Sequence, residues 1–143
     1  MRSVLVTGVS TGIGKAIAEE LLNNEFIVIG SVRKESDGED LKKQFEENFY
    51  PVKFDVTKKQ EIQNAKVEVE KILADRKSYL SCVINNAGIA LGGPVRYLDV
   101  DIFRKQFEVN FFGLIEVTKT FLDLLIDHNS YKMKNKIINI GSI

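Results

Sequence analysis

The sequence predicts an α/β fold in which a parallel sheet is covered by helices on both faces. Two observations carry this prediction. Short runs rich in β-branched residues alternate with longer stretches that have helical periodicity. The short runs are also almost continuously apolar, which is typical of strands buried on both faces. Alternation of this kind implies right-handed crossovers and therefore a doubly wound parallel sheet.

The first half of the chain supplies three strands and three helices of this pattern. Strands are expected at residues 3–7, 26–32 and 52–55, where apolar residues run together. Helices are expected at residues 12–23, 40–47 and 58–76. The third helix follows Thr57-Lys58-Lys59-Gln60, in which a threonine precedes a glutamine by three positions. This arrangement predicts a capping box at the start of the helix.

The second half adds strands at residues 82–85 and 136–140 and one long helix at roughly residues 101–127. Along this helix, residues spaced alternately by four and three form a stripe that predicts a buried face. Asn110 is the one polar member of the stripe. A buried amide costs about 1–3 kcal/mol unless its hydrogen bonds are made, so we expect Asn110 to be buried and bonded. The stripe consists of Phe103, Phe107, Asn110, Leu114, Val117, Phe121 and Leu124.

Composition narrows the class of protein. The 143 residues fit a single domain spanning residues 1–143. Twenty basic residues balance twenty acidic ones, so there is no basic field to attract nucleic acid or anionic lipid. Cys82 is the only cysteine, which suits a reducing compartment. No apolar stretch approaches the roughly 20 residues of a membrane helix. We therefore expect a cytoplasmic protein that acts on small molecules.

A glycine-rich turn joins the first strand to the first helix. It reads Thr7-Gly-Val-Ser-Thr-Gly-Ile-Gly14. Backbone N–H groups around Gly8, Gly12 and Gly14 are expected to face a diphosphate at the N-terminus of the helix. A nucleotide-triphosphatase P-loop needs four residues between its first glycine and Gly-Lys-Ser/Thr. Here five residues separate Gly8 from Gly14, and Lys15 is followed by alanine. A dinucleotide site is favoured over a purely structural turn.

The end of the second strand bears on which dinucleotide is bound. Many dinucleotide folds place an acidic residue there to bind the adenosine ribose. Here the strand ends Ser31-Val32-Arg33-Lys34, without a carboxylate. The planar guanidinium of Arg33 suits a 2′-phosphate, which a carboxylate would repel. NADP is therefore favoured, NAD remains the alternative, and a solvated loop arginine is the structural interpretation.

Five features in order along the chain resemble the short-chain dehydrogenase/reductase family. They are the Gly-x-x-x-Gly-x-Gly turn after Thr7, the pair Asp55-Val56, the tetrapeptide Asn85-Asn86-Ala87-Gly88, Asn110 and Ser142. The resemblance implies a Rossmann-like sheet with strand order 3-2-1-4-5. It implies catalytic roles for Asn110 and Ser142, with Asn110 at a helix irregularity within a proton relay. It implies cofactor contacts from Gly8, Ser10, Thr11, Gly12, Ile13, Gly14, Arg33, Asp55, Val56, Asn86, Ala87 and Gly88.

The resemblance also shows what the sequence lacks. The family's general acid/base is a tyrosine followed four residues later by a lysine. Tyr50, Tyr79, Tyr97 and Tyr131 are followed instead by Phe54, Val83, Asp101 and Asn135. We therefore expect a fold truncated at its C-terminal end, nearly inactive alone, since general acid–base catalysis contributes roughly 10²–10⁴-fold. The strand at 136–140 is then expected to be an exposed sheet edge.

These observations predict an NADP-dependent alcohol/carbonyl oxidoreductase, represented by its cofactor-binding portion. Its substrate would be a small-molecule alcohol or ketone, with bulky hydrophobic ones permitted, and the resemblance implies pairing of copies through the fourth helix. Two alternatives stay open: a non-catalytic NADP(H)-binding module and a nonfunctional fragment.

Overall fold

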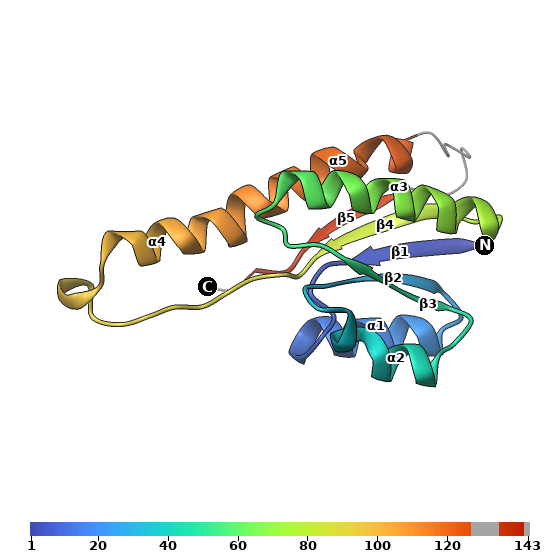
Figure 1. Cartoon of the computed structure of the whole chain (residues 1–143), viewed down its shortest axis with the longest axis horizontal. Helices are drawn as coiled ribbons and strands as arrows, with labels where there is room; N and C mark the ends of the chain where they lie inside the picture. Colours follow the sequence, from blue (N-terminus) through green and yellow to red (C-terminus); the bar gives the residue numbers. More distant parts are fainter. Residues whose placement is uncertain (127–134, 142–143) are drawn as a thin grey trace.

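A parallel sheet of five strands forms the middle layer of the molecule (Figure 1). The computed structural model describes residues 1–126 and 135–141. The strands lie in the order β3-β2-β1-β4-β5, and each neighbouring pair is parallel. This confirms the predicted order 3-2-1-4-5. The strands are β1 (Arg2–Val6), β2 (Ile27–Val32), β3 (Phe49–Lys53), β4 (Tyr79–Asn85) and β5 (Lys136–Asn139).

Helices cover both faces of the sheet (Figure 1). Helices α1 (Gly12–Asn23) and α2 (Glu39–Gln44) lie on one face, and α3 (Lys59–Asp75) and α5 (Leu114–Ile126) lie on the other. Helix α4 (Val100–Phe107) projects past the ends of the strands. Two 3₁₀ turns, η1 (Glu35–Gly38) and η2 (Val95–Tyr97), lie in the connections. Among the described helices, none has both the length and the apolar character to cross a bilayer.

Two hydrophobic cores hold these layers together. In β1, Leu5 belongs to the core under α3 and α5, while Val4 and Val6 belong to the core over α1. Successive side chains of a strand point to opposite faces, so a strand covered on both sides must be apolar throughout. Phe54 and Phe121 anchor the first core, with ring centroids 6.5 Å apart.

The third strand begins earlier than the sequence predicts. It spans Phe49–Lys53 rather than residues 52–55, and Phe49 is fully buried. The strand contains Pro51, which lacks a backbone N–H and is tolerated only at a sheet edge. β3 is an edge strand that pairs with β2 alone, with Pro51 opposite Gly30.

The capping box predicted for the third helix is wrong. The helix begins at Lys59 with Lys58 as its N-cap, and no side chain caps it. The backbone N–H and the hydroxyl of Thr57 both donate to Asp55 Oδ1, at 2.8 and 2.7 Å. Because the Thr57 hydroxyl bonds Asp55, it does not cap the helix, and Thr57 belongs to the preceding turn.

The long fourth helix is interrupted in its middle. The described part consists of α4, a π-helical segment η3 (Glu108–Gly113) and α5, and Asp127 lies outside the described residues. The irregularity implied by the family resemblance is therefore present, around Asn110. The last strand, β5, is an exposed sheet edge as predicted, since Ile137 and Ile138 are each 40% exposed.

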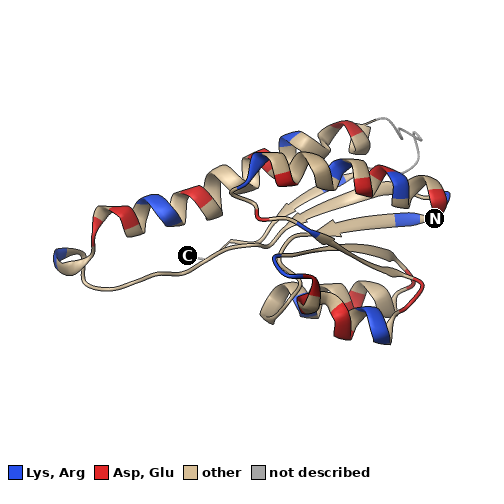
Figure 2. Cartoon of the chain, in the orientation of Figure 1, with Lys and Arg blue, Asp and Glu red and all other residues tan. Residues whose placement is uncertain are grey.

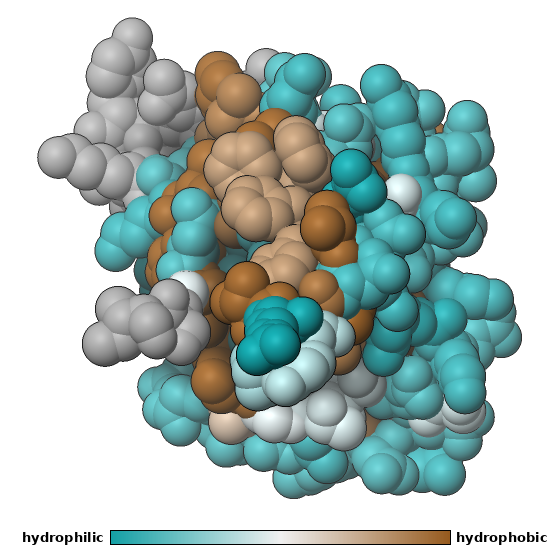
Figure 3. Space-filling view, turned by 90° about the vertical axis from the view of Figure 1, so that its left-hand side faces the viewer, coloured by the Kyte–Doolittle hydropathy of each residue, from teal (hydrophilic) through white to brown (hydrophobic). Residues whose placement is uncertain are grey.

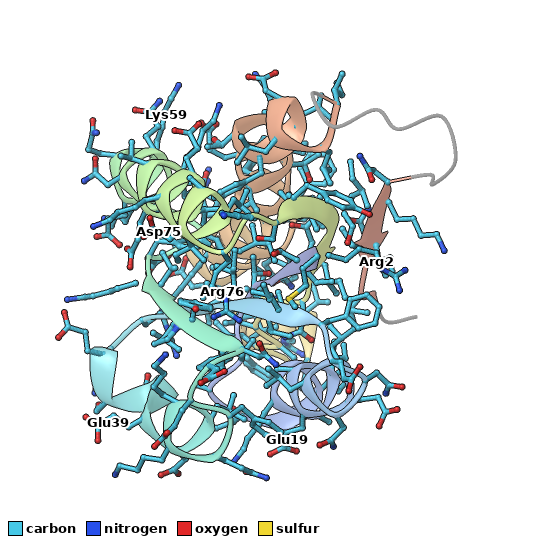
Figure 4. All side chains as sticks on the ribbon, turned by 90° about the vertical axis from the view of Figure 1, so that its right-hand side faces the viewer. Arg2, Glu19, Glu39, Lys59, Asp75 and Arg76 are labelled. Carbon is cyan, nitrogen blue, oxygen red and sulfur yellow. The ribbon has the colours of Figure 1, made fainter. Side chains whose placement is uncertain are left out.

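Two arginines make side-chain contacts at the end of the sheet where the strands begin. The guanidinium of Arg2 lies 4.6 Å from the ring centroid of Phe26, and Arg76 donates to Asn48 Oδ1 at 3.2 Å. Figure 4 views this end and shows charged side chains pointing outward around it. The candidate site lies at the opposite end, where the strands finish.

Candidate functional site

A cleft of about 340 Å³ opens where β1, β2 and β4 end. The chain leaves β1 toward one side of the sheet and β4 toward the other, which is the position where open α/β sheets bind ligands. All the predicted cofactor-contacting residues except Gly12 and Gly14 line this cleft: Gly8, Ser10, Thr11, Ile13, Arg33, Asp55, Val56, Asn86, Ala87 and Gly88.

The first glycine of the turn shapes the chain and does not present its N–H to the cleft. Gly8 has a φ of +73°, and a Cβ there would lie 3.1 Å from the Cα of Ala87. Its N–H donates to Ser31 Oγ at 2.9 Å, and the N–H of Val9 donates to the Ser31 carbonyl oxygen at 3.1 Å. The expectation that the Gly8 N–H faces a diphosphate is therefore wrong.

Backbone N–H donors are available later in the same turn, at the start of α1. Thr11 is the N-cap of this helix, and its side chain makes no capping hydrogen bond. The first N–H groups of a helix have no partner within the helix, and its dipole places partial positive charge there. Gly12 turns the chain into the helix with a φ of +61°. Since Thr11 and Ile13 line the cleft, this end of α1 is suited to hold an anion.

The end of β4 is tied to the glycine-rich turn by Thr7 and Asn86. Thr7 Oγ1 accepts hydrogen bonds from the N–H groups of Asn86 and Ala87, both at 2.9 Å. The side-chain amide of Asn86 donates to the carbonyl oxygens of Thr7 and Gly8, both at 3.0 Å. Thr7 is buried, so these bonds are shielded from water. They join the two sides of the cleft into one unit.

Asn85, the first residue of the same tetrapeptide, has a different environment. It is buried behind the cleft, where its amide nitrogen donates to Thr118 Oγ1 at 3.0 Å and to Asn139 Oδ1 at 2.9 Å. These bonds link β4 to α5 and to β5. Ser142, for which the family resemblance implies a catalytic role, lies outside the described residues.

Arg33 and Asp55 lie at the far side of the cleft from β4. Arg33 is exposed and takes part in no salt bridge within the described ranges 1–126 and 135–141. Partial burial acts to raise the pKa of Asp55, but hydrogen bonds from Thr57 and the charges of Arg33 and Lys58 outweigh it. The pKa of Asp55 is therefore lowered, and its carboxylate is ionised at neutral pH. Within the turn, Asp55 Oδ1 accepts both hydrogen bonds from Thr57.

The prediction that Asn110 is buried in the core is wrong. Its side chain is exposed and turned toward the segment that leaves β4. Asn110 Oδ1 accepts from the N–H of Ile89 at 2.8 Å, and its Nδ2 donates to the Ile89 carbonyl oxygen at 2.8 Å. The π-helical turn shifts the register of the stripe, so only its later members, Val117 and Phe121, are fully buried.

Sequence reasoning missed Ser31 and Gln106. Ser31 bonds the glycine-rich turn, and Gln106 contacts Leu91 with both ends of its amide. A signal existed for Gln106, because it precedes Asn110 by four residues and so shares its helix face. The segment that both amides contact carries no charge from Asn86 to Val95 (Figure 2).

Exposed apolar side chains gather on the end of the molecule from which α4 projects. Figure 3 shows a band of apolar surface on this end. Phe107, Phe111 and Phe112 are each at least half exposed, and their rings pack edge to face with centroids 6.3 and 5.3 Å apart. Exposed apolar patches of this kind mark interaction surfaces.

Comparison with known proteins places the chain in a family. The family described as short chain dehydrogenase matches residues 2–143. The chain therefore belongs to the short-chain dehydrogenase family, whose members are oxidoreductases.

Individual relatives are considerably longer than this chain. An NADPH-dependent 3-dehydrocapnine reductase of Ornithobacterium rhinotracheale is 38% identical over 142 residues, covering 99% of this chain and 50% of that protein. Estradiol 17-beta-dehydrogenase 2 of Rattus norvegicus is 38% identical over 146 residues, covering 99% of this chain and 36% of that protein. The Pseudomonas aeruginosa RhlG/NADP active-site complex matches with a TM-score of 0.89 at 25% identity, covering 99% and 54% of the two chains.

Proposed function

We propose that this chain forms the cofactor-binding part of an NADP-dependent alcohol/carbonyl oxidoreductase. One observation carries the proposal: residues from five separate segments line a single cleft at the ends of the parallel strands. The cleft runs from Arg33 past the uncapped start of α1 to Asn86 and Gly88. This combination of a cation at one end, helix N–H donors in the middle and an uncharged far wall fits a phosphorylated dinucleotide.

Each part of the cleft has a role in this proposal. The backbone N–H groups at Thr11, Gly12 and Ile13 would hold the diphosphate. Arg33 would bind the 2′-phosphate, with Asp55 and Val56 beside the adenine. Asn86, Ala87 and Gly88 would lie along the nicotinamide ribose. When bound, the cofactor would supply hydride to a ketone as NADPH or accept it from an alcohol as NADP⁺.

The preference for NADP over NAD rests on the charge at the end of β2. Arg33 lines the cleft without a salt-bridge partner in the described part of the chain, and Ser31 Oγ already accepts the Gly8 N–H. No carboxylate follows β2 directly to bind a ribose hydroxyl. The names of two proteins similar to this chain, an NADPH-dependent reductase and an NADP complex, support the same cofactor.

The experiment is a fluorescence titration of this chain with NADPH and NADH. NADPH is expected to bind with a Kd below about 1 mM, and at least tenfold more tightly than NADH. Arg33→Gln should weaken NADPH binding by about tenfold to about a hundredfold, because a charge-assisted bond contributes about 1.5–3 kcal/mol, and should leave NADH binding unchanged. Arg96→Gln, at the exposed turn η2, is the matched control. Binding of neither dinucleotide below about 1 mM would overturn the proposal.

A non-catalytic NADP(H)-binding module is the second candidate. It is favoured for the chain on its own by the four tyrosines, none of which has a lysine four residues later. The two functions differ in turnover. The catalytic proposal expects hydride exchange with ketone or alcohol substrates, slowed roughly 10²–10⁴-fold by the missing acid/base pair. NADPH binding without any turnover across a panel of ketones would favour the module.

A further inference from the structure

Two amide side chains, one helical turn apart, hold the backbone of the segment that leaves β4. Asn110 bonds the N–H and the carbonyl oxygen of Ile89, both at 2.8 Å. Gln106 Oε1 accepts from the N–H of Leu91 at 3.0 Å, and its Nε2 donates to the Leu91 carbonyl oxygen at 2.8 Å. The two side-chain amides thus bond the backbone at residues 89 and 91. A neighbouring strand would also bond alternate residues in this way.

The contact between Gln106 and Leu91 adds a restraint that the contact between Asn110 and Ile89 cannot provide alone. A backbone held at Ile89 alone remains free to pivot about that residue. A second bidentate contact two residues later also sets the direction of the segment. Residues 86–94 have no regular secondary structure and carry no charge, and Gly92 and Gly93 come directly after Leu91. The two amides are therefore the main restraint on the path of this segment.

This path forms part of the cleft. Gly88 and Ile89 line it on the side of Asn86, at the end away from Arg33. A Cβ on Gly88 would lie 3.3 Å from Asn110 Oδ1, so the segment packs tightly against the helix at this point. A rotation of the segment about Ile89 would turn the peptide planes next to that residue, including the one that joins it to Gly88 in this wall.

We propose that Gln106 is a positioning residue for the nicotinamide end of the cleft, acting through the backbone of Leu91. This inference rests on the proposed function, because it assigns the nicotinamide to the side of Asn86 and Gly88. In the described part of the chain, the side-chain hydrogen bonds of Gln106 go to Leu91 and not to the glycine-rich turn. Its loss leaves the contacts of Asn110, Thr7 and Arg33 in place.

The test compares Gln106→Met with Gln63→Met in the complete chain. Methionine keeps the length and helix preference of glutamine but loses both hydrogen bonds, and Gln63 is an exposed residue of α3 that serves as the control. Hydrogen exchange at the Leu91 N–H should rise about tenfold in Gln106→Met alone. NADPH affinity should fall about tenfold, with the fluorescence of the bound nicotinamide shifting toward that of the free cofactor. Binding of adenosine 2′-phosphate-5′-diphosphate, which lacks the nicotinamide, should stay within about twofold.

A conservative variant provides a rescue. In Gln106→Glu, a protonated carboxyl group can both accept and donate, whereas an ionised one only accepts. The nicotinamide fluorescence should therefore recover as the pH falls from about 6 to about 4 in this variant, and not in the wild-type chain. A purely structural role for Gln106 would not produce this pH dependence.

The outcomes separate the two proposals. Failure of the wild-type chain to bind NADPH overturns the proposed function and, with it, the role of Gln106. If the wild-type chain binds NADPH, unchanged exchange at Leu91 in Gln106→Met overturns the positioning role. Faster exchange with unchanged NADPH affinity and fluorescence also overturns it, leaving Gln106 as a loop clamp. If Gln106→Met weakens the binding of NADPH and of adenosine 2′-phosphate-5′-diphosphate equally, the positioning role is also overturned. The effect is then not confined to the nicotinamide end of the cleft.

Discussion

Gly14 lies against the carbonyl oxygen of Gly8 so closely that no side chain fits between them. A Cβ on Gly14 would lie 2.0 Å from that oxygen and 2.3 Å from Asn86 Nδ2. Gly14 is buried and does not line the cleft. Its role is to let α1 approach the glycine-rich turn and the end of β4, so that the start of the helix faces the cleft.

Gly14→Ala is therefore expected to destabilise the protein. The neighbouring atoms are backbone and a bonded amide, which cannot yield easily, and overpacking of this kind costs about 1–3 kcal/mol. Gly92→Ala is the matched control, because a Cβ there meets nothing within 4 Å. Urea unfolding of both variants measures the difference. Equal stability of the two variants would contradict the close approach.

Thr7→Val should loosen the connection between β1 and β4. Valine has nearly the same shape but leaves the N–H groups of Asn86 and Ala87 without their acceptor. Each unsatisfied buried donor costs about 1–3 kcal/mol, so we expect a loss of at least that size. Thr7→Ser retains the hydroxyl and should cost less. Urea unfolding gives the stabilities, and a smaller loss in Thr7→Val than in Thr7→Ser would count against the role of the hydroxyl.

The sheet and the outline of the cleft could be predicted because they depend on local signals. A continuous apolar run ends at Asn85, and a glycine-rich turn follows the first strand. Parallel strands bring the residues after their ends to one edge, so Gly8, Asp55 and Asn86 had to meet. The structure brings all three to the same cleft.

The side-chain contacts within the site could not be predicted in this way. Ser31 accepts the Gly8 N–H from 23 residues away, and Asn110 contacts Ile89 across 21 residues. Periodicity shows which face of a helix is apolar, but the π-helical turn at Glu108–Gly113 rotates that face. The spacing therefore predicts a buried Asn110, although this residue is exposed and contacts Ile89.

The stability of the protein should depend on the ionisation of Asp55. Its folded-state pKa lies below the ordinary value of 3.8, so the ionised form stabilises the folded protein. This contribution is complete above the unfolded-state pKa and is lost as the pH falls through the folded-state value. The stability advantage of wild type over Asp55→Asn should therefore shrink below about pH 4.

Chemical unfolding between about pH 3 and pH 6 measures this effect. Thr57→Val provides a graded comparison, because it removes the hydroxyl donor to Asp55 but keeps the backbone N–H. Its pH dependence should lie between those of wild type and Asp55→Asn. Identical pH profiles for all three chains would contradict the assignment.

The aromatic side chains on the projecting helix predict association between copies of the chain. Phe107, Phe111 and Phe112 are 60%, 51% and 53% exposed, and their rings contact one another. Since the rings already contact solvent, Phe111→Lys should cost little stability in a single copy, within about 0.5 kcal/mol. The same substitution places a charge in any interface that covers this face, where burying it unpaired is costly.

Sedimentation velocity should therefore show concentration-dependent association of the wild-type chain and its loss in Phe111→Lys. Val67→Lys, at a 67% exposed position on α3, should associate like wild type. Association that persists in Phe111→Lys but disappears in Ile138→Lys would instead place the contact at the open edge of β5.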